Sequence, residues 1–544
     1  MDFLWRYQLN HMFFRYLFWN YIGSEGDAQD AGVSWKPTWG IPFLIGLFGI
    51  YYQFRKDWKM GLVFLGMFIA LGPILALYQN QQEPQPRERD YFYVGAFYVF
   101  SLWIAVGIVG VIDVLRESIA AKSVRDIAAY GILALAVVAV PSRILAMNWH
   151  EHDRSGNYVA WDYSYNILQT CEKDAILFTN GDNDTFPLWY LQDVEGVRRD
   201  VRIVNLSLVN TSWYIQQMKD RPYYPEAQAV PISMSDAQIA NIQPTLWRVR
   251  DIDLPVTDEA IRKFGVTDTT MLRERRVRFT VRPTLEVGET KAIRIQDRMV
   301  LDIALTNAWK RPIYFAVTCA PDSKLGLEEY LWFHGLAWRL EPRKIHREDF
   351  GLDPKILEAN LFQEPEAFSQ TPAYGYKFRR VNDPNVYFDE NITRLMLNYR
   401  SAFLRLAMYQ ANVGGSFASA TATLDRMESL IPRKKIPMGW ELSSDLAGFY
   451  HRIGQKEKFE EISIEVESEA LAQIESGQFN LSSYWNPYRV LLDLYEQRGD
   501  NAKALGLLRQ LQVKYPGDPG LRQRVEMLEG RMAAQGPQAK DSTR

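Results

Sequence analysis

The sequence predicts a multi-domain protein with three parts: an α-helical membrane region of about four spans, an extracytoplasmic α/β domain with parallel strands, and a C-terminal all-α domain of tetratricopeptide-like repeats. Long uncharged runs are confined to residues 39–147 of the 544. Short apolar runs alternate with helical patterns between residues 148 and 385, and glycine-punctuated helix pairs recur from 386 to 535. These patterns are typical, in that order, of membrane spans, βαβ units and helical repeats.

The overall composition excludes one class of partner. The chain has 62 basic and 65 acidic residues and a net charge of −3, so no nucleic-acid partner is predicted. Its two cysteines are too few for a disulfide framework. The first segment lacks an apolar core followed by a small-residue cleavage site, so we predict no secretory signal peptide and expect internal spans to direct any export.

Residues 1–38 are dominated by aromatic side chains. The segment MDFLWRYQLNHMFFRYLFWNYIG carries Arg6, His11 and Arg15 at spacings of four to five residues. This pattern predicts a helix that lies in the membrane interface. The alternative is that the segment ends a larger membrane domain that precedes it.

Four apolar runs predict the spans. They cover residues 39–56, 60–78, 91–113 and 127–147. A helix needs about 20 residues to cross a bilayer core of about 30 Å. The first run is therefore marginal, and the fourth must place Arg143 at an interface.

Basic residues in two loops predict the orientation. Residues 55–59, RKDWK, join the first two spans and residues 116–125 join the last two, so the positive-inside rule places both loops in the cytoplasm. The loop at 79–90 and everything after residue 147 then lie outside it. We therefore expect a multi-pass protein of the cytoplasmic (inner) membrane, with its large domains on the periplasmic or extracytoplasmic side.

Residues 148–385 carry the pattern of an α/β domain. The runs DAILFTN (174–180) and DVRIVNLSL (200–208) predict buried strands, and the helical pattern between them predicts a βαβ unit with parallel strands. RPIYFAVT (311–318) predicts a third strand. Cys171 precedes the first strand and Cys319 follows the third, at opposite ends of a parallel sheet, so no disulfide between them is expected.

Two further segments complete the chain. In RRVRFTVRP (275–283) apolar and basic residues alternate, and we expect this strand to pair with TKAIRI (290–295) in a hairpin with a basic outer face. That face is either a solvated edge or a binding surface. Further on, LLDLYEQRGDNAKALGLLRQLQVKYPGDP has the spacing of a tetratricopeptide unit, and residues 536–544 are expected to be a disordered tail.

The first polar cluster is QQEPQPRERDYFYVGAF, residues 81–97, where ionic residues meet the third span. Arginines beside hydrocarbon are suited to bind a phosphate through paired hydrogen bonds, and arginines on the outer side go against the positive-inside rule. An equally simple interpretation is a helix-start cap whose arginines pair with its own glutamates. The candidate phosphate or donor ligands are Glu83, Arg87, Arg89, Asp90 and Tyr91.

The second cluster, TNGDNDTFPLWY (179–190), follows a predicted strand at its carboxyl end. Loops at that position commonly bind ligands, and a sugar, an acceptor or a hard divalent cation would suit the oxygen-bearing side chains of Asn180, Asp182, Asn183 and Asp184. The spacing does not match an EF-hand loop. The same residues are also ordinary turn and cap chemistry, with Asp184 as a helix N-cap.

The third cluster, WHEHDRSGNY (149–158), directly follows the fourth span. His150 and His152 have no third ligand at a recognisable spacing. No metal site is predicted, and an interfacial polar belt is favoured.

Several long motifs together resemble a bacterial family of large multi-span proteins described as protein O-mannosyltransferase-like. They are EPQPRERDYFYVGAF, HDRSGNYVAWDY, LFTNGDNDTFPLWYLQDVEGVRRDVRIVNLSLVNTSWY and RPIYFAV. The resemblance implies a membrane glycosyltransferase of the GT-C class, which transfers a sugar such as mannose from a polyprenyl-phosphate donor to Ser or Thr of exported proteins. It implies membrane lipid, the lipid-linked sugar and the protein acceptor as partners, and no redox or nucleotide cofactor.

The chain departs from such enzymes in its number of spans. GT-C enzymes carry their acidic catalytic residue in the first extracytoplasmic loop of a much larger helix bundle, whereas four spans are predicted here. The resemblance is therefore to the C-terminal part of the family, no catalytic residue is carried over, and a partner chain with the N-terminal half is expected. The resemblance assigns Arg87 and Arg89 to the donor site. The alternative function is a membrane-anchored extracytoplasmic scaffold without catalysis.

Overall fold

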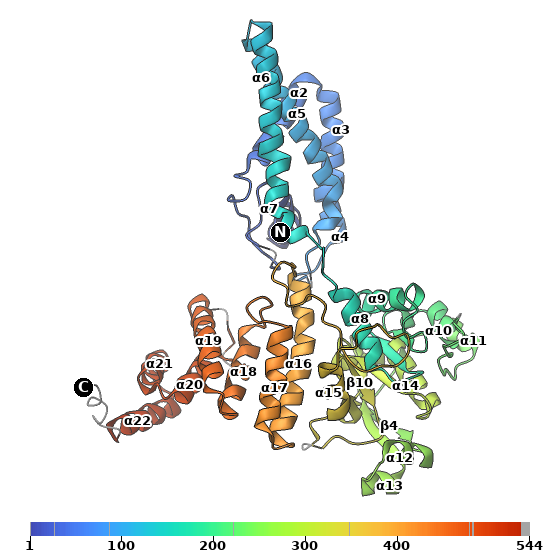
Figure 1. The fold of residues 1–544 in the computed structure, drawn as a ribbon. Helices are drawn as coiled ribbons and strands as arrows, with labels where there is room; N and C mark the ends of the chain where they lie inside the picture. The colour runs from blue at the N-terminus through green and yellow to red at the C-terminus, as the bar shows by residue number, and fades with distance from the viewer. Residues whose placement is uncertain are drawn as a thin grey trace. The chain divides into compact units, whose positions relative to one another are not determined.

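The computed structural model divides the chain into two compact units. Unit 1 comprises residues 1–156 with 385–392, and unit 2 comprises residues 157–384 with 393–544. Figure 1 shows the chain as a ribbon and labels many of the helices and a few of the strands. The predicted tail, 536–544, lies outside the described residues. The structure describes residues 2–26, 28–85, 87–220, 222, 224–346, 349–477, 479–480 and 483–534.

Three helices of unit 1 are long and apolar enough to cross a membrane: Trp58–Gln79, Asp90–Ser118 and Lys122–His152. The first predicted span forms the shorter helix α2 (Ile41–Lys56), with 16 residues, so a fourth span stays a prediction. The first long helix comprises α3 (Trp58–Ile69), η2 (Ala70–Ile74) and α4 (Leu75–Gln79). The second comprises η3 (Asp90–Tyr93) and α5 (Val94–Ser118). The third comprises α6 (Lys122–Val137), η4 (Val138–Ser142) and α7 (Arg143–His152).

Helices α2 and α5 pack at very close range because glycines face each other across the contact. A Cβ atom on Gly49 would lie 1.8 Å from the carbonyl oxygen of Trp103, and one on Gly107 would lie 2.3 Å from the carbonyl oxygen of Ile45. Small residues at such positions let two backbones approach closely. The buried Trp103 indole donates a 2.6 Å hydrogen bond to Gln53, which ties the same pair of helices together.

The aromatic N-terminal segment is helical, as predicted, but its buried face packs against the apolar helices. It forms η1 (Phe3–Phe14) and α1 (Arg15–Tyr21). Phe13, Tyr16 and Tyr21 are buried in one apolar cluster with side chains of α5 such as Phe97 and Phe100. Aromatic side chains bury large apolar areas, so this segment is part of the core of unit 1.

A five-stranded sheet forms the centre of the α/β region in unit 2. Its strand order is β2-β1-β8-β10-β9. Strands β1, β2 and β8 run parallel, which confirms the predicted βαβ arrangement, and β10 and β9 continue the sheet in antiparallel pairs. The strands are β1 (Ile176–Thr179), β2 (Arg202–Asn205), β8 (Ile313–Ala316), β9 (Leu331–Phe333) and β10 (Ala337–Leu340).

Two small sheets lie apart from the central sheet. One has the order β3-β7-β6, and the other pairs β4 with β5. The expected pairing of residues 275–283 with 290–295 is therefore wrong, because β5 pairs with β4 and β7 pairs with β3 and β6. The strands are β3 (Thr245–Leu246), β4 (Arg250–Pro255), β5 (Arg276–Val281), β6 (Leu285–Val287) and β7 (Thr290–Ile293).

Helices make up the rest of unit 2. Those of the C-terminal part follow one another along the chain, and from α18 to α22 each packs on the next. A tetratricopeptide-like array remains a prediction for this part. The C-terminal helices are α16 (Glu390–Asn412), α17 (Phe417–Leu430), α18 (Trp440–Arg452), α19 (Lys456–Ser476), α20 (Pro487–Arg498), α21 (Asn501–Lys514) and α22 (Pro519–Ala534). The α/β region carries α8 (Val159–Thr170), α9 (Gly181–Asp193), η5 (Leu208–Asn210), α10 (Ser212–Lys219), α11 (Asp236–Ala240), α12 (Asp258–Phe264), α13 (Thr269–Glu274), α14 (Ile295–Asn307), η6 (Pro321–Lys324), η7 (Glu328–Tyr330) and α15 (Pro354–Phe362).

Candidate functional site

The ionic stretch 81–97 is held in place by the N-terminal helical segment. Arg6 forms a 3.0 Å ion pair with Glu83, and Arg15 forms a bidentate pair with Glu88 at 2.8 and 3.2 Å. The interpretation in which arginines of this stretch pair with its own glutamates is therefore wrong. Both glutamates are neutralised by arginines that lie more than 70 residues earlier in the chain.

Glu88 is the best-satisfied carboxylate of the stretch. Besides Arg15 it accepts hydrogen bonds from the Tyr16 hydroxyl and from the backbone N–H of Asp30. Burial alone would raise the pKa of Glu88, but the hydrogen bonds from Arg15, Tyr16 and Asp30 outweigh it and hold the pKa below its usual value. The Tyr16 hydroxyl also accepts the backbone N–H of Arg89, at 2.9 Å. Glu88 therefore serves to anchor the loop.

Arg87 and Arg89 are left with no carboxylate partner among the residues that the structure describes. Arg89 donates to the Tyr91 hydroxyl at 2.9 Å and to the Gln85 side chain at 3.4 Å. No hydrogen bond or ion pair is formed by the Arg87 guanidinium within the described part of the chain. Of the predicted donor ligands, the structure thus brings Arg89 and Tyr91 together and engages Glu83 with Arg6.

Asp90 lines a pocket that Arg87 and Arg89 do not line. This pocket lies in unit 1, measures about 820 Å³ and is also lined by Glu88. The pocket is rich in carboxylates, with Glu151 and Asp389 added, and Arg154 lies 3.7 Å from Asp389. Asp90 thus lines this acidic pocket without the two arginines with which it was predicted to act.

His150 and His152 lie in the last turn of the third long helix. His152 lines the acidic pocket, and the His150 ring packs edge-on against Tyr387 with 5.5 Å between ring centres. Among the described residues, no group of three or more His, Cys, Asp or Glu side chains is arranged to hold a metal ion.

The second predicted cluster lies at the carboxyl edge of the central sheet, between β1 and α9. Helix α9 begins at Gly181 with Asn180 as its N-cap, so the prediction of Asp184 as N-cap is wrong by one helical turn. Asp184 instead accepts hydrogen bonds from the Thr318 hydroxyl, at 2.6 Å, and from the backbone N–H of Asn180, at 3.2 Å. Burial raises the pKa of Asp184, and these two hydrogen bonds oppose the rise.

Hydrogen bonds from the neighbouring strands fix the position of this loop. Asn205, at the end of β2, donates to the Gly181 carbonyl and to the Thr185 hydroxyl, both at 2.8 Å. Because β2 and β8 flank β1 on opposite sides, the loop lies where the chain order of a parallel sheet reverses, a common place for ligands. Asn180, Asp182 and Asn183 are exposed there, which leaves their side-chain oxygens accessible.

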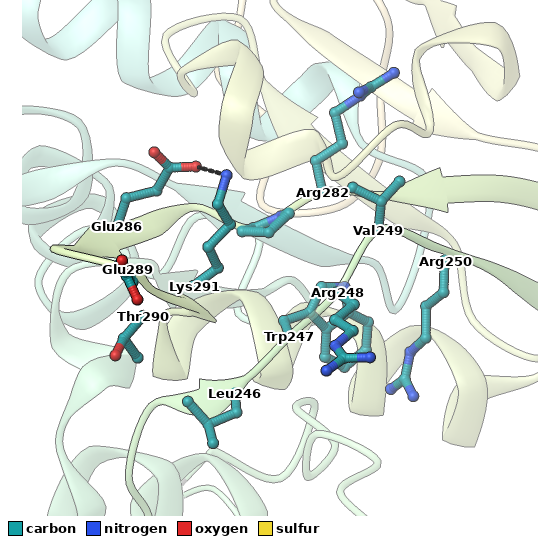
Figure 2. Close-up of a pocket in the computed structure, with 11 residues that line it drawn as sticks. Leu246, Trp247, Arg248, Val249, Arg250, Arg282, Glu286, Glu289, Thr290 and Lys291 are labelled. Atoms are coloured by element: carbon teal, nitrogen blue, oxygen red, sulfur yellow. Dashed lines mark ion pairs between the residues drawn. The ribbon is translucent and has the colours of Figure 1, made fainter.

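A basic pocket in unit 2 was not predicted. It measures about 1020 Å³ and lies between the β3–β4 segment and the β6–β7 hairpin, as Figure 2 shows. Its lining includes Arg248, Arg250, Arg282 and Lys291. Sequence reasoning missed it because each arginine alone is typical of a solvated strand edge, and the pocket forms only where 246–250 meets 282–291.

Comparison with known proteins gives a family match to part of the chain. Residues 160–249 and 240–358 match a family described as TMEM260-associated domain 2. The matched segments contain the central sheet, the 180–184 loop and the basic pocket, and they leave more than half of the chain unmatched. No curated protein and no solved structure matches the chain.

Proposed function

We propose that this chain is part of a membrane glycosyltransferase that moves a sugar, mannose in the first instance, from a polyprenyl-phosphate donor to Ser or Thr of exported proteins. Three findings support the proposal. Unit 1 has three helices long and apolar enough to cross a membrane. The matched family is described as TMEM260-associated domain 2, and TMEM260 is described as protein O-mannosyltransferase-like. The third finding, the state of Arg87 and Arg89, carries the proposal.

These two arginines have the properties that a lipid phosphate requires. They directly precede the helix Asp90–Ser118, at the level where the headgroup of a membrane lipid would lie if that helix crosses the bilayer. A guanidinium binds phosphate through two parallel hydrogen bonds. Glu83 and Glu88 are already paired with other arginines, and Asp90 forms no ion pair with Arg87 or Arg89 among the described residues, so no carboxylate forms an ion pair with either arginine.

The proposal also gives the location of the chain in the membrane and the roles of its other parts. The catalytic base comes from a partner chain that supplies the N-terminal half, the chain lies in the cytoplasmic (inner) membrane, and unit 2 faces the extracytoplasmic side. The loop with Asn180, Asp182, Asn183 and Asp184 engages the acceptor or its sugar. The lipid-linked sugar is the donor substrate, and we propose no redox or nucleotide cofactor.

The proposal is tested by measuring binding of a synthetic polyprenyl phosphate to the full chain in detergent, with the unphosphorylated polyprenol as reference. Removing both guanidinium groups in the double variant Arg87→Gln/Arg89→Gln should weaken phosphate binding by about tenfold or more. Binding of the polyprenol should not change. Arg116→Gln is the matched control, because Arg116 is an exposed arginine at the other end of the same helix. Equal affinity of the double variant and the wild-type chain would refute the donor role.

A second candidate is a membrane-anchored scaffold without catalysis. The successive helices α16 to α22 favour it, because arrays of packed helices offer extended surfaces for partners. Sugar transfer by the chain assembled with its membrane partner separates the two functions. Transfer that depends on Arg87 and Arg89 supports the enzyme. Sugar transfer that is unchanged in the Arg87→Gln/Arg89→Gln variant supports the scaffold. A chain that has no affinity for the lipid phosphate supports it as well.

A further inference from the structure

The acidic pocket of unit 1 adjoins the loop that carries Arg87 and Arg89. Its volume of about 820 Å³ is within the range of small-molecule sites. Glu88 and Asp90 line it, and in the chain they alternate with the two arginines. The pocket and the proposed phosphate ligands therefore draw on one short loop.

The end of helix α7 supplies this pocket with hydrogen-bond acceptors. The amide nitrogen of Asn148 donates to the Ile144 carbonyl at 2.9 Å, which leaves the amide oxygen available. His152 Nδ1 donates to the Asn148 carbonyl at 2.9 Å, so in the neutral ring Nε2 is an acceptor. The Glu151 carboxylate forms no hydrogen bond or ion pair among the described residues. All three side chains line the pocket, and each offers it an acceptor.

The other walls add further acceptors. Asn20 donates its amide nitrogen to the Tyr16 carbonyl at 2.9 Å, so here too the amide oxygen is left. Asp389 accepts the backbone N–H of Ile392 at 2.9 Å and lies 3.7 Å from Arg154. Arg154 is the sole Lys or Arg in the described lining. A pocket rich in acceptors and poor in cations suits a ligand that brings its own donors and carries no negative charge.

Aromatic rings lie beside these acceptors. Trp19, Trp149 and Tyr387 line the same pocket. The Trp19 ring is fixed, because its indole N–H donates to the Gly32 carbonyl at 3.0 Å and the Arg15 guanidinium lies over it at 4.4 Å. Trp149 is 62% exposed, and its side chain makes no ring contact or hydrogen bond within the described part of the chain. It therefore offers an open aromatic face with an N–H donor at its edge.

We propose that this pocket binds the uncharged sugar ring of the lipid-linked donor, a hexose whose hydroxyls donate to Asn148, Glu151 and His152 and whose C–H face lies on the Trp149 ring. Sugar C–H groups carry partial positive charge, which suits the negative face of an aromatic ring. The carboxylates that line the pocket repel an acidic sugar such as a uronate. The inference rests on the proposed function, because it names the class of sugar and the residues that bind it.

The test uses a probe without phosphate, methyl α-mannoside, and measures its binding to the full chain by saturation-transfer NMR in a detergent without a sugar headgroup. Trp149→Ala should bind it about tenfold more weakly. Trp5→Ala is the matched control, because Trp5 is 63% exposed in unit 1 and does not line the pocket. It should bind within about twofold of wild type. Equal losses in the two variants, or no saturable binding to the wild-type chain, would overturn the proposal.

Two further probes test the class of ligand. Methyl glucuronide has the same ring with a carboxylate, and it should bind at least about tenfold more weakly than the mannoside. Equal binding of the two would refute the selection for an uncharged sugar. Tetramethylammonium, at the concentration of the mannoside, should not displace it. Complete displacement would assign the pocket to a cation held by the carboxylates and aromatic rings instead.

The same measurements separate the sugar pocket from the proposed phosphate site. The variant Arg87→Gln/Arg89→Gln should bind methyl α-mannoside as the wild-type chain does, while it loses affinity for polyprenyl phosphate. Polyprenyl-phosphate binding that resists this double substitution refutes the donor role of the arginines alone. Mannoside binding that resists Trp149→Ala refutes the sugar pocket alone.

Discussion

Replacing Gly49 by alanine tests the close contact between α2 and α5. The new Cβ would lie 1.8 Å from the carbonyl oxygen of Trp103, whereas carbon and oxygen atoms in contact normally stay about 3.3 Å apart or more. The neighbour is backbone, so no side chain can move aside, and the helices must separate by about 1.5 Å locally. A radial gap of about 0.5–1 Å already forfeits a quarter to a half of the dispersion energy of each contact.

The expected cost is about 1–3 kcal/mol of unfolding free energy, as for other overpacked contacts. Thermal unfolding of the full chain in detergent, followed by the loss of helical circular dichroism, measures it. Gly66→Ala in α3 is the matched control, because its Cβ meets nothing within 4 Å and alanine favours helix over glycine by about 1 kcal/mol. If Gly49→Ala unfolds at the same temperature as Gly66→Ala, the argument from close backbone approach is refuted.

Three further predictions concern unit 2. Arg198 is fully buried and bonds to Asp200 and to the carbonyls of Leu168, Cys171 and Glu172, so Arg198→Met should lower the unfolding free energy in urea by about 3–5 kcal/mol; a loss below about 1 kcal/mol would contradict this. Burial would raise the pKa of Asp200, but its hydrogen bonds from Arg198 hold it below the usual value. The contribution of ionised Asp200 to the free energy of unfolding should thus be complete above about pH 4 and disappear as pH falls through the lower folded-state pKa. Urea unfolding midpoints measured across this acidic range should fall accordingly, and midpoints without this fall would disprove the prediction. Burial raises the pKa of the Cys171 and Cys319 thiols to about 12, so iodoacetamide should label neither near neutral pH until denaturant is added; labelling of the native chain, read by mass spectrometry, would show that they are accessible.

The central sheet was predictable because its signals are local. Residues 174–180 and 200–208 are short apolar runs on either side of one helical pattern, and such a unit has essentially one arrangement, the parallel βαβ. The pairing of residues 275–283 was not predictable in the same way. Two alternating strands of similar length can pair with several partners, and the choice of β4 over β7 depends on contacts between segments that are distant in sequence.

The candidate site shows the same limit. The sequence indicated that Arg87 and Arg89 were unusual for their place in the chain, but their freedom from carboxylates depends on Arg6 and Arg15, which pair with Glu83 and Glu88 from more than 70 residues away. Asp184 was placed correctly at the sheet edge. Its predicted role as N-cap was wrong because the helix begins at Gly181 with Asn180 as its N-cap, four residues earlier, and Asp184 instead accepts a hydrogen bond from Thr318.

The two ion pairs of the N-terminal segment have a consequence for how this chain can evolve. The Arg15 side chain is 9% exposed and that of Glu88 23%, so a neutral substitution at either position leaves a partly buried charge without its ion-pair partner, which is costly. Substitutions at positions 15 and 88 should therefore be inherited together in related sequences, and the same holds more weakly for the exposed pair at 6 and 83. Arg87 is free of this constraint within the fold, so where it is retained, selection must act through something that it binds.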